Sequence, residues 1–131
     1  MPNTNMFLRY ALLADAIVSG ATGLLLIVGA GVLAGLLNLP VPLLREAGLI
    51  LVPYVAFVAF VGTRANISRG ATAVVIAANV LWTAASVLLL LSNYVAPNAL
   101  GIAFVLMQAV AVAAFGAAQF IGLRQTAALT A

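Results

Sequence analysis

The chain contains a run of 54 consecutive residues, from Gly70 to Leu123, without a single charged side chain. An α-helix rises about 1.5 Å per residue and the hydrocarbon core of a bilayer is about 30 Å thick, so roughly 20 residues cross it once. One helix of 54 residues would be about 80 Å long, far more than one crossing needs. The run must therefore turn, and residues 92–98 (Ser-Asn-Tyr-Val-Ala-Pro-Asn) carry a turn signal near its middle.

Composition excludes several classes of protein. Apolar residues make up 66% of the 131 positions and charged residues only 5%, compared with about a quarter in an ordinary soluble domain. Such a chain has too few polar residues to cover a water-soluble fold, too many apolar ones to stay disordered, and no cysteine for a disulfide framework. We therefore expect an integral membrane protein.

The positions of the charges and the prolines predict four membrane-spanning helices. Pro40 and Pro42 cannot continue a helix and separate the first span from the second, within which Pro53 is expected to produce a kink. The fold class is accordingly all-α, a single domain over residues 1–131 that forms an antiparallel up-down-up-down four-helix bundle. The expected helices cover residues 8–37, 43–62, 70–91 and 98–122.

The distribution of the five basic residues, all arginines, predicts the orientation of the bundle. With four crossings, Arg9, Arg64, Arg69 and Arg124 fall on one side of the membrane and Arg45 on the other. Because basic residues concentrate on the cytoplasmic side, both termini are expected in the cytoplasm. The arginines form no basic patch with aromatic residues, so we expect no nucleic-acid partner.

Asp15 is an isolated acid inside the first span, and Ser19 and Thr22 lie on the same helical face 4 and 7 residues later. A charge at the middle of a bilayer costs about 2.5–3.5 kcal/mol, so a proton or cation site is one interpretation of this acid. The other interpretation is structural: Asp15 lies near the cytoplasmic boundary, where it could reach water or pair with Arg64 or Arg124. The sequence favours the structural interpretation and leaves the proton site open.

Polar residues recur along the third predicted helix at intervals of seven. Such spacing keeps them on one seam of a left-handed helix pair. Either they form hydrogen bonds between helices, worth about 0.6 kcal/mol each, or they line a polar path for a solute. We favour hydrogen bonding because nothing on the seam is ionisable. The seam consists of Thr72, Asn79, Ser86 and Asn93, with Thr83 close to it.

Two glutamines and two aromatic residues share one face of the fourth predicted helix, at offsets of 0, 4, 11 and 15. They could line a pocket for a flat ring, such as a quinone or a pigment. The alternative is that they contact other helices or a second protein. We favour this second interpretation. These residues are Phe104, Gln108, Phe115 and Gln119.

Arg45 and Glu46 begin the second predicted helix, just after the prolines. Glu46 suits the positive end of the helix dipole, and Arg45 suits an interfacial anchor. The alternative is a charged site on the outer face that binds a partner or a lipid head group.

The absence of certain residue types argues against catalysis. The chain has no histidine and no cysteine, so it cannot build the usual metal, haem or iron–sulfur sites, or a nucleophile–histidine pair. Asp15 and Glu46 are expected near opposite faces of the membrane and cannot act together as acid and base. We expect a protein that is not an enzyme and binds no metal or cofactor, a lipid or quinone being the one ligand class left open.

Four short motifs give the chain a resemblance to known proteins: Leu39-Pro40, residues 44–48 (Leu-Arg-Glu-Ala-Gly), residues 79–82 (Asn-Val-Leu-Trp) and residues 99–101 (Ala-Leu-Gly). With them the chain resembles the small, uncharacterised four-helix inner-membrane proteins of proteobacteria. This resemblance implies a multi-pass protein of the bacterial inner membrane and implies no activity. The early acid is similar to that of small multidrug transporters, but the aromatic and small residues around that acid are missing, so no function is carried over.

Three functional hypotheses follow from the sequence. The first is a non-catalytic accessory or structural subunit of a larger membrane complex, or a homo-oligomer, because the chain has little mass outside the membrane and abundant packing glycines such as the Gly31/Gly35 pair. Its partners would be lipids and another membrane protein or a second copy. The second is a small proton-coupled transporter that uses Asp15. The third is a lipid- or quinone-binding protein.

Overall fold

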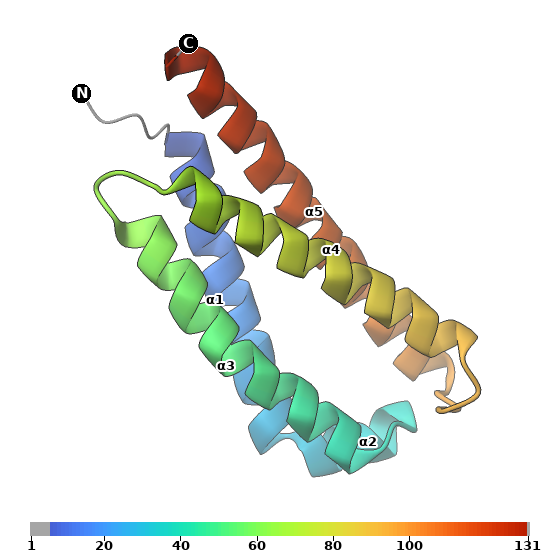
Figure 1. Ribbon diagram of the computed structural model, residues 1–131. Coiled ribbons are helices and arrows are strands. Elements are labelled where there is room, and N and C mark those ends of the chain that lie inside the picture. The colour runs from blue at the N-terminus through green and yellow to red at the C-terminus, as the bar shows by residue number, and fades with distance from the viewer. Residues whose placement is uncertain (1–5, 131) are drawn as a thin grey trace.

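The computed structural model describes residues 6–130, which form helices and no strands (Figure 1). Four of the helices are long and apolar enough to cross a membrane, as the sequence predicts, and the fold is that of a helical, multi-pass membrane protein. The helices are α1 (Met6–Val28), α2 (Ala30–Leu37), α3 (Val41–Thr63), α4 (Arg69–Leu91) and α5 (Ala99–Thr130).

The first expected helix, residues 8–37, is in fact two helices, α1 and α2, which meet at Gly29. The Gly29 amide donates to the Leu25 carbonyl at 2.7 Å, and the Gly29 carbonyl accepts from the Leu33 amide at 2.9 Å. A Cβ atom on Gly29 would lie only 2.8 Å from the Leu25 carbonyl oxygen. The break therefore needs a residue without a side chain at this position. α2 ends at Asn38, which adopts the left-handed conformation (φ 56°, ψ 49°).

The other helices differ from expectation mainly at their ends. α3 begins at Val41, two residues early, because Pro42 is tolerated in the first turn of a helix, and Pro53 lies inside α3. α4 begins after Ser68, whose hydroxyl accepts a hydrogen bond from the Ala71 amide at 3.1 Å. α5 continues to Thr130, eight residues beyond the expected end, because no proline or glycine follows Gly122 to stop it.

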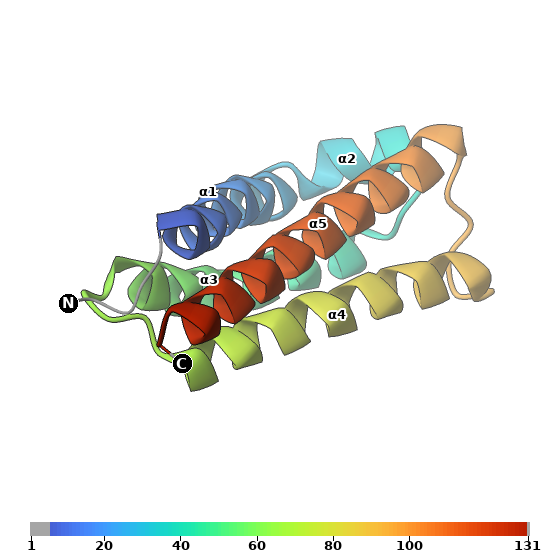
Figure 2. The ribbon, with the colours of Figure 1, turned by 90° about the horizontal axis from the view of Figure 1, so that it is seen from above.

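The helices pack chiefly as two pairs, α1 with α3 and α4 with α5, and α5 also packs against α1 (Figures 1 and 2). α3 and α4 touch each other very little. Arg9 on α1 donates to the Gly62 carbonyl near the end of α3 at 2.7 Å, and Arg69 on α4 donates to the Leu123 carbonyl of α5 at 3.1 Å. These bonds hold the start of one helix beside the far end of its partner.

Two apolar clusters form the interior. The first lies around α2 and the start of α3 and includes Leu37 and Leu44; the second lies around the start of α1 and the end of α3 and includes Leu12 and Val58. The Tyr54 side chain packs against both clusters. The exterior is also apolar, with Leu, Ile, Val and Phe side chains exposed along every spanning helix. A surface of this kind matches lipid rather than water.

Glycines allow close approach where α1 crosses α3. A Cβ on Gly48 would lie 2.8 Å from Ile27 Cγ1 and 2.9 Å from the Gly23 carbonyl oxygen. By contrast, a Cβ on Gly31 or Gly35 would meet no atom within 4 Å. The tight packing expected of the first span is therefore found at Gly23 and not at the Gly31/Gly35 pair.

Candidate functional site: a polar cluster beside a central cavity

Asp15 lies at the centre of the bundle and is only 1% exposed. Leu8, Leu12 and Ser19 are buried on the same face of α1, so the helical repeat turns the carboxyl group inward. The Ser19 hydroxyl donates to Asp15 Oδ1 at 2.8 Å. The sequence pattern predicted this pair as the start of a polar stripe.

Three other helices bring polar groups to the second carboxyl oxygen, Asp15 Oδ2. The Tyr54 hydroxyl of α3 lies 2.6 Å from it, and the Gln119 amide nitrogen of α5 donates to it at 2.8 Å. The Asn79 amide nitrogen of α4 donates to it at 3.3 Å and to Gln119 Oε1 at 2.8 Å. We call these five residues, Asp15, Ser19, Tyr54, Asn79 and Gln119, the Asp15 cluster.

The Asp15 cluster contains one hydrogen too few when Asp15 is ionised. The Tyr54 hydroxyl has one hydrogen but lies close to two acceptors, Asp15 Oδ2 at 2.6 Å and Asn79 Oδ1 at 2.8 Å. Exchanging the oxygen and nitrogen of the Asn79 amide makes Asn79 the donor to Tyr54, but it turns the Asn79 oxygen toward Gln119. The Gln119 amide must then be exchanged as well, which places its oxygen against Asp15 Oδ2. The first arrangement leaves one pair of acceptors facing each other, and the exchanged arrangement leaves two, because the Asn79 oxygen then also faces Asp15 Oδ2.

The arginines lie elsewhere. Arg64 stacks on the Phe60 ring at 4.4 Å and Arg124 lies over the Phe120 ring at 5.8 Å, while the hydrogen bonds to Asp15 come from uncharged side chains in the part of the chain that the structure describes. The interpretation in which Asp15 reaches water or pairs with Arg64 or Arg124 is therefore wrong. Instead, Asp15 is buried within the bundle, and side chains of all four spanning helices take part in its cluster.

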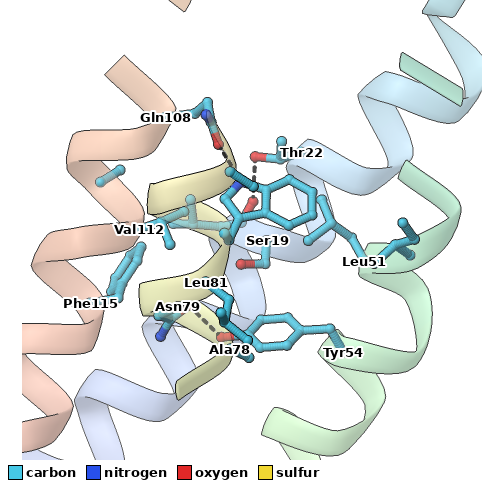
Figure 3. Close-up of a pocket in the computed structure, with 15 residues that line it drawn as sticks. Ser19, Thr22, Leu51, Tyr54, Ala78, Asn79, Leu81, Gln108, Val112 and Phe115 are labelled. Carbon is cyan, nitrogen blue, oxygen red and sulfur yellow. Dashed lines mark hydrogen bonds between the residues drawn. The ribbon is translucent and has the colours of Figure 1, made fainter. Parts of the chain in front are cut away.

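A cavity of about 450 Å³ adjoins the Asp15 cluster and is lined by α1, α3, α4 and α5 (Figure 3). We call it the central cavity. Most of its wall is apolar, and the polar residues along it are Ser19, Thr22, Tyr54, Asn79, Trp82 and Gln108. Its volume is typical of sites for small ligands.

α3 and α4, the two helices that scarcely touch each other, both line the central cavity. Ile50 of α3 and Leu81 of α4 line it and are 60% and 70% exposed, and Val18 of α1 is 44% exposed, so the cavity has its mouth beside these apolar side chains. With the bundle in a bilayer, this mouth faces lipid. A second groove, about 820 Å³, lies between α4 and α5 and is lined by Asn79, Thr83, Phe120 and neighbouring small and apolar residues.

The structure brings together residues that the sequence assigned to different features. Asp15, Asn79 and Gln119 come from three separate predicted sets and meet in one cluster. Thr22, Gln108 and Phe115 line the central cavity.

The remaining residues of the predicted sets lie apart from the Asp15 cluster. Thr72 and Thr83 donate to carbonyls of their own chain four residues back, and Ser86 donates to the Trp82 carbonyl. Within the predicted seam, cross-helix hydrogen bonds are made by Asn79 and by Ser86, which accepts from Gln108. Phe104 packs in the first apolar cluster, whereas Arg45, Glu46 and Asn93 are exposed.

Sequence reasoning missed Tyr54. A signal was present, because Tyr54 lies in the middle of its span rather than at the membrane interface, where tyrosines concentrate. Trp82 is partly buried and donates to Gln108 Oε1 at 2.6 Å.

Fold and site together define a multi-pass helical membrane protein with a buried carboxyl group and an internal cavity. Comparisons with family models, with curated proteins and with solved structures found no match to this chain. Its function is therefore inferred from the Asp15 cluster and the central cavity.

Proposed function

We propose that this protein binds a lipid-soluble small molecule within the membrane, in the central cavity. The observation that carries the proposal is the cavity itself, about 450 Å³ with apolar walls and a few polar groups from four helices. Because exposed apolar side chains of the spanning helices, Ile50 and Leu81, line its mouth, a ligand dissolved in the bilayer could enter without crossing water. This favours the third hypothesis drawn from the sequence, a lipid-binding membrane protein.

Filling the cavity tests the proposal. Ala85 lines the central cavity, so the larger side chain of phenylalanine at this position should occupy the ligand's space. Ala77 is exposed on the same helix and lies outside both the central cavity and the second groove, which makes Ala77→Phe the matched control. After extraction in mild detergent, mass spectrometry should find a co-purified small molecule with the wild type and Ala77→Phe but not with Ala85→Phe. Equal retention by all three proteins would contradict the proposal.

A second function, proton-coupled transport through Asp15, is supported by the hydrogen balance of the Asp15 cluster. A hydrogen on Asp15 Oδ2 would donate to Tyr54, Tyr54 would donate to Asn79 Oδ1, and every contact would pair a donor with an acceptor. We propose that Asp15 holds this proton within the cluster and is the group through which a proton would pass.

Infrared spectroscopy can test this second proposal because Asp15 and Glu46 are the only acidic side chains of the chain. The spectrum at neutral pH should contain the carbonyl band of a protonated carboxyl group. Asp15→Asn should remove that band and Glu46→Gln should leave it unchanged. A wild-type spectrum without the band would rule out the proton on Asp15.

The orientation of the protein in the membrane is also a proposal. The arginine distribution supports an antiparallel bundle with both termini in the cytoplasm, and the resemblance to small proteobacterial proteins supports a bacterial inner membrane. An accessory role in a larger complex, or a homo-oligomer, stays a prediction from composition.

A further inference from the structure

Hydrogen bonding at the central cavity restricts the chemistry of its ligand. Two hydroxyl groups of α1 face the cavity, and both already donate their hydrogen within the protein. The Ser19 hydroxyl donates to Asp15 Oδ1 at 2.8 Å, and the Thr22 hydroxyl donates to the Val18 carbonyl at 2.8 Å. Neither hydroxyl can therefore donate to a ligand without breaking one of these bonds.

Tyr54 and Asn79, at the boundary with the Asp15 cluster, are similarly committed. The single Tyr54 hydrogen lies between two acceptors, and the two hydrogens of the Asn79 amide point to Asp15 and Gln119.

The polar pair at the other end of the cavity is also complete. The Trp82 indole nitrogen donates to Gln108 Oε1 at 2.6 Å. The Gln108 amide nitrogen donates to the Ser86 hydroxyl at 3.0 Å and to the Val105 carbonyl at 2.8 Å. The quinone pocket considered from the sequence requires a donor from this helix face, and Gln108 has no hydrogen left to give.

What remains at the cavity wall is acceptor capacity. A hydroxyl oxygen has two lone pairs, and in the part of the chain that the structure describes Ser19 and Thr22 act as donors, with their lone pairs unused. Ser19 is 8% exposed and Thr22 is more open, so Thr22 Oγ1 is the more accessible acceptor. It lies three residues after Ser19 and faces the same space (Figure 3).

Charge restricts the ligand further. Among residues 6–130, those that line the central cavity include no charged side chain. An anionic ligand such as a fatty-acid carboxylate would lose its hydration there without a positive partner or a donor. A quinone carbonyl, which can only accept, would be left unpaired as well.

We infer that the ligand of the central cavity is an uncharged apolar molecule that carries a hydroxyl group and donates its hydrogen to Thr22 Oγ1. This inference rests on the proposed function, since it names the ligand class of the same cavity. It divides lipid-soluble molecules into alcohols, which fit, and ethers, ketones and quinones, which leave the cavity's acceptors unused.

A matched pair of probes tests the inference: decan-1-ol, which has a hydroxyl hydrogen, and decyl methyl ether, in which a methyl group replaces it. Trp82 is the only tryptophan of the chain and lines the cavity, so its fluorescence reports binding directly. Titration of the full-length protein in detergent should show decan-1-ol binding about fivefold more tightly than the ether, as expected for one hydrogen bond.

The variants locate the acceptor. Thr22→Val keeps the shape of the side chain and removes the oxygen, so the preference for decan-1-ol should fall to about equal affinity for both probes. Thr83→Val, the same change at a residue of the second groove, should keep the preference. Both threonine hydroxyls donate to their own helix in the wild type, so neither variant breaks a bond between helices.

The outcomes separate the two proposals. Equal affinity of the wild type for the two probes, or an unchanged preference in Thr22→Val, would overturn the inference while leaving cavity binding intact. If neither probe changes Trp82 fluorescence in the wild type more than in Ala85→Phe, the proposed function itself fails.

Discussion

Asp15 is the residue on which the interior of the bundle depends. A buried carboxyl group in a low-dielectric interior is costly unless its oxygens are hydrogen-bonded, and here Ser19, Tyr54, Asn79 and Gln119 supply partners from four helices. Each partner is itself buried or half-buried and needs Asp15 in return. The cluster is therefore a shared arrangement in which losing Asp15 removes a hydrogen-bond partner from each of the other four members.

Removing the Asp15 carboxyl group should destabilise the protein. We expect Asp15→Ala to lower the free energy of unfolding by about 3 kcal/mol, because it opens a cavity and leaves the buried Ser19 hydroxyl and Gln119 amide nitrogen without their acceptor. Asp15→Asn keeps the size and the hydrogen-bonding capacity and should cost less than half as much. Unfolding in detergent, followed by circular dichroism, measures both, and equal stability of the two variants would contradict the shared arrangement.

The sequence predicts most members of the Asp15 cluster, but it does not predict that they contact one another. Asp15 with Ser19, Asn79 in the seam, and Gln119 beside the aromatic residues could all be identified, because helical periodicity tells which residues share a face. Periodicity on one helix does not fix how that helix is rotated relative to its neighbours. The contacts between Asp15, Asn79 and Gln119 depend on that rotation and could not be predicted.

Pairs of helices are held together by glycines at specific crossings. The small-residue motif at Gly31 and Gly35 indicates a surface that can pack closely, but it does not say which helix lies opposite. The structure leaves that surface open and uses Gly23 and Gly48 where α1 crosses α3. Spacing in the sequence therefore predicts close packing of the first span without locating it.

Adding one methyl group at the crossing should separate α1 from α3. Gly48→Ala places a Cβ 2.8 Å from Ile27 Cγ1 and 2.9 Å from the Gly23 carbonyl oxygen, which requires the helices to move. We expect a loss of about 1–3 kcal/mol in the free energy of unfolding. Gly31→Ala is the matched control, because its Cβ meets no atom within 4 Å and alanine is the better helix former, by about 1 kcal/mol. A Gly48→Ala protein as stable as the control would contradict the close crossing.

The whole molecule combines an apolar exterior with arginines near the helix ends. The four spans could be predicted because lipid imposes both their length and their composition, and the prolines and the charges limit where they end. The sequence did not predict the break at Gly29 or the extension of α5 beyond Gly122. Both depend on local contacts rather than on the thickness of a membrane. The prediction of the orientation rests on the distribution of charged residues alone, and it is best tested in cells.

Single cysteines can test that orientation because the chain contains none of its own. Asn66 lies in the loop between α3 and α4 and is exposed, and Tyr94, in the loop between α4 and α5, is 92% exposed. With both termini in the cytoplasm, a membrane-impermeant maleimide added to bacterial spheroplasts should label Tyr94→Cys, and should label Asn66→Cys only after permeabilisation. Labelling of Asn66→Cys alone in intact spheroplasts would reverse the orientation. Labelling of both would show that α4 does not cross the bilayer, and the number of spans would then have to be revised.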